Sequence, residues 1–146
     1  MRTVPASRRM PHFGKASLAR SLPGHGIEYV HMPELGGLRK PSRESKNLGW
    51  RNESFRGYAD HMQSDEFWHA VERLEDLARD RRVAVMCAEA VPWRCHRSLI
   101  ADALTVRGDD VRHITGKGAP AVHSVTPFAR IENCRISYPP PDTLAL

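Results

Sequence analysis

The sequence predicts an α/β fold: a mostly parallel sheet with helices on both faces, in a Rossmann-like three-layer arrangement. The first observation is that apolar runs typical of strands alternate with amphipathic segments typical of helices. This alternation favours right-handed strand–helix–strand units, which build parallel sheets. The second observation is the unbroken apolar run Val83–Cys87, which suits a central strand covered on both faces. Met1–Val4, Ile27–His31 and Val111–Ile114 are the other predicted strands.

Three segments have the spacing of helices. Ala16–Leu22 places leucines four residues apart and stops at a Pro-Gly pair. Residues 65–80 follow a serine cap, have an acidic first turn and place apolar side chains at helical intervals. His96–Arg107 carries an apolar face, and Gly108 closes this third predicted helix.

The remaining segments are predicted to be irregular or hairpin-forming. Residues 33–52 are rich in Gly, Pro, Ser and Asn, and a loop of this length in a compact domain indicates a functional loop that packs on the domain. Phe128–Ile131 and Arg135–Tyr138 suit a small hairpin near the C-terminus. We therefore expect one domain over residues 1–138 and a tail over residues 139–146.

Composition narrows the classes of function. A chain of 146 residues is long enough for one real core. It has no apolar run that could span a membrane and no signal-peptide pattern, so we expect no membrane partner. Three cysteines without framework spacing suit a reducing cytoplasm. The formal charge of +5 favours an anionic small molecule or nucleic acid as partner, and no cofactor motif is present.

The residues capable of chemistry follow the predicted strands. In a parallel sheet, ligands bind beyond the carboxyl ends of the strands. These residues should therefore gather at one edge of the sheet. The group consists of Arg2, Ser7, Arg8, His31, Glu34, Gly36, Gly37, Cys87, Glu89, Cys95, His96 and Arg97.

The predicted catalytic residues are Cys95, His96 and Glu34. A thiol at a helix N-terminus, beside His96 and Arg97, is expected to have a lowered pKa and could act as a nucleophile. Glu34 lies just past a predicted strand and could carry a proton. The alternative for Cys95 is a small residue that only caps a helix against a tight turn.

The predicted ligand-binding residues are arginines, loop aromatics and a helix start. The arginines and Ser98 could bind a phosphate or carboxylate, or the arginines could pair with loop glutamates to hold the loops together. Trp50, Arg51 and Tyr58 could stack on a base or sugar, or the two aromatic side chains could form a packed lid. The full set is Arg2, Arg8, Trp50, Arg51, Glu89, Arg97 and Ser98.

Cys87 is a candidate second thiol. At the end of a buried strand it could simply be a packing residue. It could also form a reversible disulfide with Cys95. Cys87, Cys95 and His96, with Glu89 or His31, could supply zinc ligands. We predict no metal site, because Cys95 and His96 are expected to point in different directions and no C-x2-C pair is present.

Six stretches of the chain together carry a family resemblance: Val4–Phe13, Tyr29–Gly37, Gly49–Asn52, Phe55–Tyr58, Met86–Glu89 and Cys95–Ser98. In combination they resemble DUF488, a family of small bacterial α/β proteins named as a domain of unknown function. The resemblance implies an α/β fold and no settled activity. Members are expected to begin with a Thr-Ile-Gly-His-Ser strand and a helix before a Val-Asp-Val-Arg strand. This sequence begins within that second strand, so we expect the first strand and helix to be missing and the sheet to be left open.

Three functions follow. The leading one is an enzyme that acts on a phosphate-bearing ligand, a nucleotide or nucleic acid, at a Cys/His/Arg site. The alternative is a non-catalytic accessory protein that binds nucleic acid. This hypothesis is based on the formal charge of +5. The third is a redox or metal-binding protein that uses the cysteines.

Overall fold

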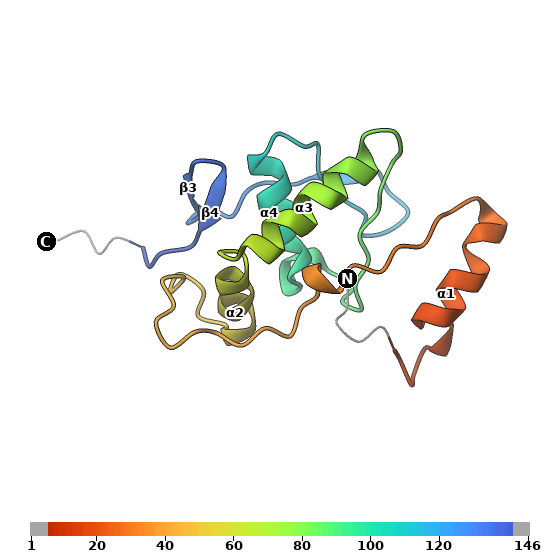
Figure 1. The fold of residues 1–146 in the computed structure, drawn as a ribbon, viewed down its shortest axis with the longest axis horizontal. Helices are drawn as coiled ribbons and strands as arrows, with labels where there is room; N and C mark the ends of the chain where they lie inside the picture. The colour runs from red at the N-terminus through yellow and green to blue at the C-terminus, as the bar shows by residue number, and fades with distance from the viewer. Residues whose placement is uncertain (1–5, 142–146) are drawn as a thin grey trace, which may run out of the picture.

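The computed structural model describes residues 6–141. Over this range the chain forms four α-helices, four 3₁₀ turns and two antiparallel two-stranded sheets (Figure 1). The helices are α1 (Lys15–Ser21), α2 (Glu53–His61), α3 (Asp65–Ala78) and α4 (Arg97–Val106). The 3₁₀ turns are η1 (Pro11–Phe13), η2 (Pro23–His25), η3 (Pro33–Leu35) and η4 (Pro92–Arg94). The sheets pair β1 (Arg112–His113) with β2 (Ala121–Val122), and β3 (Arg130–Glu132) with β4 (Arg135–Ser137).

The predicted parallel, Rossmann-like sheet is wrong. Residues 27–31 and 83–87 pair with no strand among residues 6–141, and residues 112–113 pair antiparallel with β2. The apolar pattern suits a strand, but a parallel strand also needs neighbours to satisfy its N–H and C=O groups. Without such neighbours, Val83 and Met86 are 41% and 47% exposed. The predicted first strand, residues 1–4, lies outside the described residues.

The three predicted helices are confirmed as α1, α3 and α4. Helix α3 begins at a serine cap, where the Ser64 hydroxyl accepts the N–H of Phe67. Its apolar stripe, which includes Phe67, Val71 and Leu74, is buried. After α4, Gly108 adopts a φ of 101°, a left-handed conformation that favours glycine.

Helix α2 was not predicted, although the sequence carries a signal for it. The Asn52 side chain accepts the N–H groups of Ser54 and Phe55 and so caps the helix. Gly57 lets the helix approach the preceding loop, because a Cβ at this position would lie 2.2 Å from the Arg39 carbonyl oxygen. Asn52 followed by the acidic Glu53 is the local signal that sequence reasoning missed.

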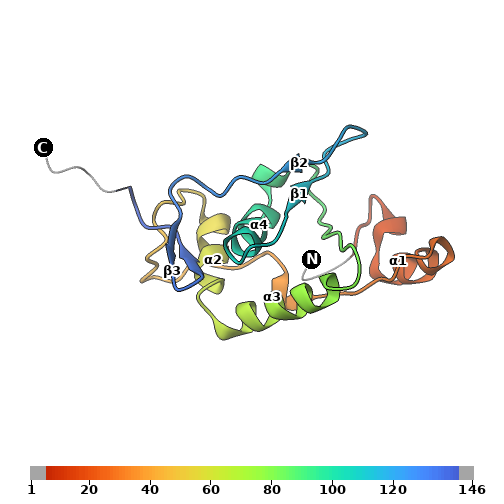
Figure 2. The same cartoon turned by 90° about the horizontal axis from the view of Figure 1, so that it is seen from above.

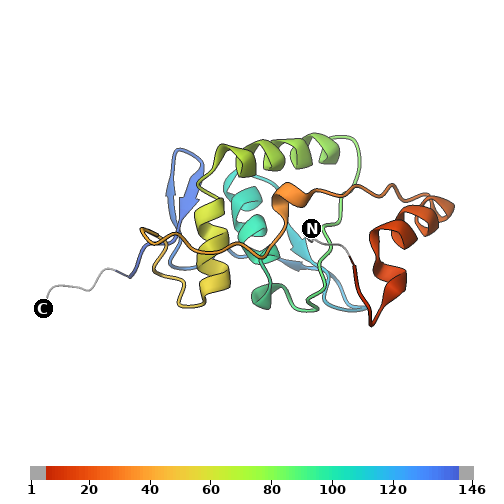
Figure 3. The ribbon, with the colours of Figure 1, turned by 60° about the horizontal axis from the view of Figure 1, so that its bottom comes forward.

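The core lies between α2, α3 and α4, and strand β4 contributes to it. Figure 2 shows α4 between α3 and the β1–β2 ribbon. The predicted loop over residues 33–52 is irregular apart from η3, which lies against α3 (Figure 3). The loop packs on the core through Trp50, whose ring centroid lies 4.8, 5.0 and 5.5 Å from those of Phe55, Phe128 and Tyr138.

The predicted C-terminal hairpin is confirmed as β3–β4. Asn133 and Cys134 connect the strands with φ angles of 50° and 58°, as in a type I′ turn. Just past β4, the Tyr138 N–H donates to Oδ1 of the buried Asn47 at 2.9 Å. The hairpin is thereby attached to the long loop.

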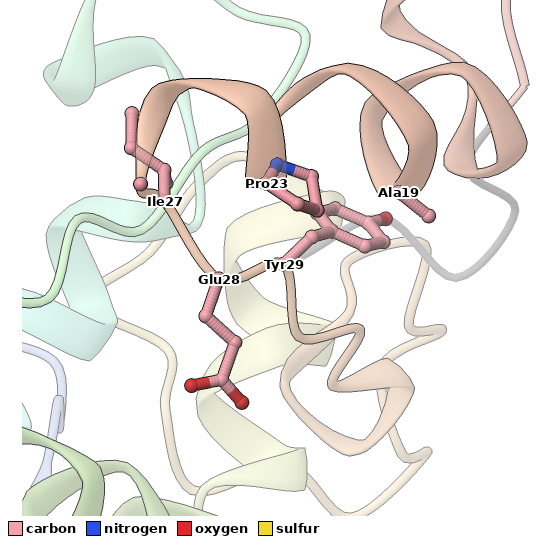
Figure 4. A pocket seen from close by; sticks show the side chains of 6 residues that line it. Ala19, Pro23, Ile27, Glu28 and Tyr29 are labelled. Carbon is pink, nitrogen blue, oxygen red and sulfur yellow. The ribbon is translucent and has the colours of Figure 1, made fainter.

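The N-terminal arm, which carries α1, extends away from the other helices (Figure 1). It holds a shallow pocket of about 400 Å³, where Tyr29 lies beside Pro23 and Ala19 (Figure 4). Its one carboxylate, Glu28, forms an ion pair with Arg81. The pocket contains no nucleophile and is not a candidate site. No helix among the described residues has the length and apolar character needed to cross a membrane.

Candidate functional site

Three side chains capable of chemistry meet at the start of α4. They are Cys87, Cys95 and His96, and one ligand atom of each lies within 4.8 Å of the other two. Cys87 is the last residue of the unpaired, strand-like segment 83–87. Cys95 directly follows η4, and His96 is the N-cap residue of α4. The loop over residues 88–94 brings the two cysteines together without any sheet. We call this group the thiol cluster.

The two cysteines differ in their surroundings. Cys95 is 3% exposed, whereas Cys87 is only half-buried. The Cys95 Sγ lies 3.6 Å from Nδ1 of His96 and accepts a hydrogen bond from Nε of Arg97 at 3.4 Å. Both cysteines are free thiols.

The two thiols share a proton through a hydrogen bond. The hydrogen bond from Cys95 lowers the pKa of Cys87 to about 4, burial opposes this, and the N–H of Glu89 lowers it further. The same hydrogen bond, together with burial, raises the pKa of Cys95. The expectation of a lowered pKa at Cys95 is therefore not met. The thiolate lies at Cys87, because it is the more exposed sulfur and receives backbone hydrogen bonds.

The His96 ring is held between a glycine and an aromatic side chain. A Cβ at Gly37 would lie 2.9 Å from Nδ1 of His96, so glycine is what allows this approach. On another side, the His96 ring centroid lies 4.9 Å from that of Tyr58. The loop that follows η3 therefore positions one member of the thiol cluster.

Three side chains hold this loop; sequence reasoning missed Arg39 and His61, and it selected Tyr58 only as a stacking residue. The Tyr58 hydroxyl donates to the Leu35 carbonyl at 2.9 Å, and burial raises the pKa of Tyr58. Arg39 donates to the carbonyls of Gly36 and Glu34. His61 Nε2 lies 2.7 Å from the Glu34 carbonyl, and burial lowers the pKa of His61. These contacts join residues that are distant in sequence, so no local pattern signals them.

The carboxylate of Glu34, the predicted proton carrier, lies away from the thiol cluster and against α3. Its Oε1 lies 3.5 Å from Nη1 of Arg73 on α3, and its Oε2 is buried without a partner. The carboxylate is not part of the thiol cluster. The main chain of Glu34 supports the loop, while its side chain pairs with α3.

The predicted anion-binding groups at the start of α4 donate within the protein. The Arg97 guanidinium donates to Cys95 Sγ and to the main-chain oxygen of Glu89. The Ser98 hydroxyl donates to the carbonyl of Cys95 at 3.0 Å. The Glu89 side chain is exposed. Arg97 and Ser98 are thus next to the thiol cluster and support it.

The other predicted ligand-binding residues do not join them. Arg8 and Arg51 are exposed, and Trp50 belongs to the aromatic part of the core. Arg2 lies outside the described residues. Of the predicted site, the structure brings together the two thiols, His96, Arg97 and Ser98.

The thiol cluster offers a donor set suited to a metal ion. Tetrahedral zinc with bonds of about 2.3 Å to sulfur and about 2.0 Å to nitrogen separates two such ligands by about 3.6 Å. The Cys95 Sγ and His96 Nδ1 are 3.6 Å apart. The expectation that these neighbouring side chains point in different directions is therefore wrong.

The family model described as "Domain of unknown function DUF488" matches residues 1–104 of the 146-residue chain. The chain belongs to the DUF488 family. The match covers the thiol cluster and the η3 loop and ends within α4. Strands β1 to β4 of this DUF488 protein therefore lie beyond the matched range. No curated protein and no solved structure matches the chain.

Proposed function

We propose that this DUF488 protein is a dithiol enzyme that exchanges Cys87 and Cys95 with a substrate disulfide. The observation that supports this is the pair itself: two hydrogen-bonded sulfurs, one half-exposed and one buried. An accessible thiolate can attack a substrate, and a protected neighbour can then resolve the intermediate. The chain lacks the spacing of thioredoxin-type motifs, so the proposal depends on this contact.

The reaction has two steps. The Cys87 thiolate attacks one sulfur of the substrate disulfide, the substrate S–S bond breaks, and the first substrate thiolate leaves and takes a proton from solvent. Cys95 then gives up its proton and attacks Sγ of Cys87. This step forms the Cys87–Cys95 disulfide and releases the second substrate thiol. The substrate gains two electrons and two protons; the cysteine pair supplies both electrons and one of the protons, and solvent supplies the other.

Neighbouring groups assist the second step. His96 Nδ1, 3.6 Å from Cys95 Sγ, is placed to accept the proton that Cys95 loses. The Nε–H of Arg97 already points at the same sulfur and stabilises negative charge as it develops there. Both are residues that the sequence selected as candidates.

Reaction with 5,5′-dithiobis(2-nitrobenzoate) tests the proposal. All proteins carry Cys134→Ser, because Cys134 is exposed in the hairpin turn and would react independently. The parent should release two nitrothiobenzoate ions for one cysteine pair and end as an internal disulfide without a label. Adding Cys95→Ser should stop the reaction at one released ion, with the label on Cys87. A parent that keeps labels on both cysteines would contradict the proposal.

Metal binding is the second candidate function, and the convergence of three ligand atoms within 4.8 Å favours it. Two thiolates and an imidazole with an open fourth position are a donor set typical of catalytic zinc. Metal analysis of the purified protein tests it. One zinc per chain, lost in His96→Ala, would support metal binding, whereas metal-free protein that cannot be loaded with zinc would exclude it.

The anionic-ligand and nucleic-acid functions gain less support. Arg97 and Ser98 already donate to protein atoms, which weakens the case for a phosphate cradle between them. The formal charge of +5 is still the main support for nucleic-acid binding. It would appear as affinity that falls steeply with salt concentration, with a slope set by the number of phosphates contacted.

A further inference from the structure

A buried carboxylate lies in α4, away from the thiol cluster. Asp102 is fully buried, yet its two oxygens accept three hydrogen bonds. His123 Nε2 and the Thr126 N–H reach Oδ1 at 2.8 and 2.9 Å, and the Tyr138 hydroxyl reaches Oδ2 at 2.7 Å. Three donors offset much of the cost of burying the charge.

A second histidine extends this arrangement to the surface. Nε2 of His113 lies 2.8 Å from Nδ1 of His123, whose side chain is 6% exposed. An ionised carboxylate only accepts, so Nε2 of His123 carries the proton and Nδ1 of a neutral His123 is an acceptor. His113 must then donate from Nε2. This leaves Nδ1 of His113 unprotonated, with its lone pair free to accept a proton.

His113 lies in the wall of a cleft of about 740 Å³. Helices α3 and α4, the extended segment 81–85 and the region around β1 enclose it. Its apolar walls include Leu74, Val83, Val85, Ile100 and Leu104. The unpaired strand-like segment thus forms one side of the cleft.

The charged groups of the cleft are largely paired. Arg81 pairs with Glu28, Arg112 with Asp110, and Glu75 with Arg107.

Two guanidinium groups at the cleft have no carboxylate partner among residues 6–141. Arg82 has no ion pair, and Arg97 donates to a sulfur and a carbonyl. Asp109 also lines the cleft, and burial raises its pKa. Two guanidinium groups against this one carboxyl group, together with the apolar walls, favour an anionic ligand whose body is apolar.

We propose that Asp102, His123 and His113 form a hydrogen-bonded chain that makes His113 a general base toward a small anion with an apolar body, bound in this cleft. Nδ1 of His113 takes a proton from an O–H or N–H of the ligand and becomes an imidazolium. The ligand keeps the electron pair, and the chain that ends at Asp102 stabilises the new positive charge. The proposal is independent of the dithiol function.

The electrostatics of His113 agree with this role. Burial lowers the pKa of His113 and Arg97 lowers it further, whereas the Asp102 carboxylate raises it. The imidazole is therefore neutral at neutral pH and able to accept a proton. The match to the DUF488 family ends at residue 104, so both histidines lie beyond the region that defines the family.

Acylation by diethyl pyrocarbonate, mapped by mass spectrometry, tests the proposal. An unprotonated ring nitrogen attacks the reagent's carbonyl, and ethyl carbonate leaves. His113 should react at least as fast as the exposed His12, His25 and His69, which serve as internal references. Benzoate, at about ten times its dissociation constant, should slow the reaction of His113 about tenfold and leave the references unchanged. Benzyl alcohol, the neutral analogue, should not protect.

A variant and a second measurement test the hydrogen-bonded chain from Asp102 to His113. Asp102→Asn should slow the acylation of His113 by about tenfold, because a carboxylate behind an imidazole raises its basicity. If that variant does not fold, nitrogen-15 NMR of the unaltered protein decides: both histidines should carry their proton on Nε2. A proton on Nδ1 of His113, or acylation no faster than that of buried His123, would overturn the proposal. Equal protection by benzyl alcohol would overturn the choice of an anion.

Discussion

Gly37 lies against the imidazole of His96, at a distance that leaves no room for a side chain. A Cβ at residue 37 would be 2.9 Å from Nδ1 and 3.1 Å from Cε1 of that ring. Because Tyr58 contacts the same ring, His96 has little freedom to move aside. This contact links the η3 loop to the thiol cluster.

Gly37→Ala is therefore expected to destabilise the protein by about 1–3 kcal/mol, as overpacking does. It should also slow the closure of the Cys87–Cys95 disulfide, since His96 must shift. Urea unfolding and the release of nitrothiobenzoate measure the two effects. Gly24→Ala is the matched control, because nothing lies within 4 Å of a Cβ at that position. Equal behaviour of the two variants would show that the contact is not restrictive.

The reactivity of Cys87 should depend on pH in a distinctive way. In the folded protein its thiolate forms near pH 4, so alkylation by iodoacetamide should proceed at a constant rate between about pH 5.5 and 8. In denaturant the same residue should follow the ordinary thiol value of 9.0 and react about tenfold faster per pH unit over that range. Peptide mapping resolves the rate at Cys87. If the alkylation rate of Cys87 in the folded protein rose with pH as it does in denaturant, the two thiols would not share a proton.

The same proton links stability to pH. Between about pH 4 and pH 9 the folded pair has released one proton that the unfolded thiols still hold. Because the unfolded state binds more protons, the free energy of unfolding should rise with pH over this window. Above pH 9 the raised pKa of Cys95 reverses the sign, since the folded pair then holds a proton that the unfolded chain has lost. The difference between the parent and Cys87→Ala, measured by urea unfolding across pH, isolates this contribution. A difference that does not vary with pH would exclude it.

Asp102 should be among the most sensitive positions for stability. Asp102→Ala removes a buried carboxylate and leaves His123, the Thr126 N–H and the Tyr138 hydroxyl without their acceptor. We expect a loss of about 3–5 kcal/mol in thermal or urea unfolding. Asp76→Ala is the control: this carboxylate pairs with Arg79 on the surface, and its loss should cost less than about 1 kcal/mol. A small loss at Asp102 would mean that the three donors find other partners.

Helices α1, α3 and α4 could be predicted from the sequence, whereas the pairing of residues 83–87 could not, for a physical reason. The cap at Ser64 and the apolar stripe of α3 are local signals, and they carry most of the information about a helix. A strand such as 83–87 depends on partners elsewhere in the chain, so its apolar pattern alone does not establish pairing.

Part of the candidate site could likewise be predicted from the sequence, and part could not. Cys87 and Cys95 are close in sequence, and their meeting could be anticipated from the loop between them. Which sulfur holds the proton depends on burial and on backbone N–H groups, which the sequence does not display. The hydrogen-bonded chain to His113 joins three separate segments, and its one local signal is an aspartate, Asp102, on the apolar face of a helix.

Tyr138 has a consequence for the order in which the protein matures during synthesis. Its hydroxyl reaches Asp102 in α4, and its N–H reaches Asn47 in the long loop. Both partners are translated well before it. Helices α2 to α4 can form as they leave the ribosome, but the charge at Asp102 gains its last donor only after Tyr138 has emerged. A nascent chain stalled before that residue would carry a nearly complete set of helices around an unfinished core, and would stay open to proteases and chaperones until the final strand is released.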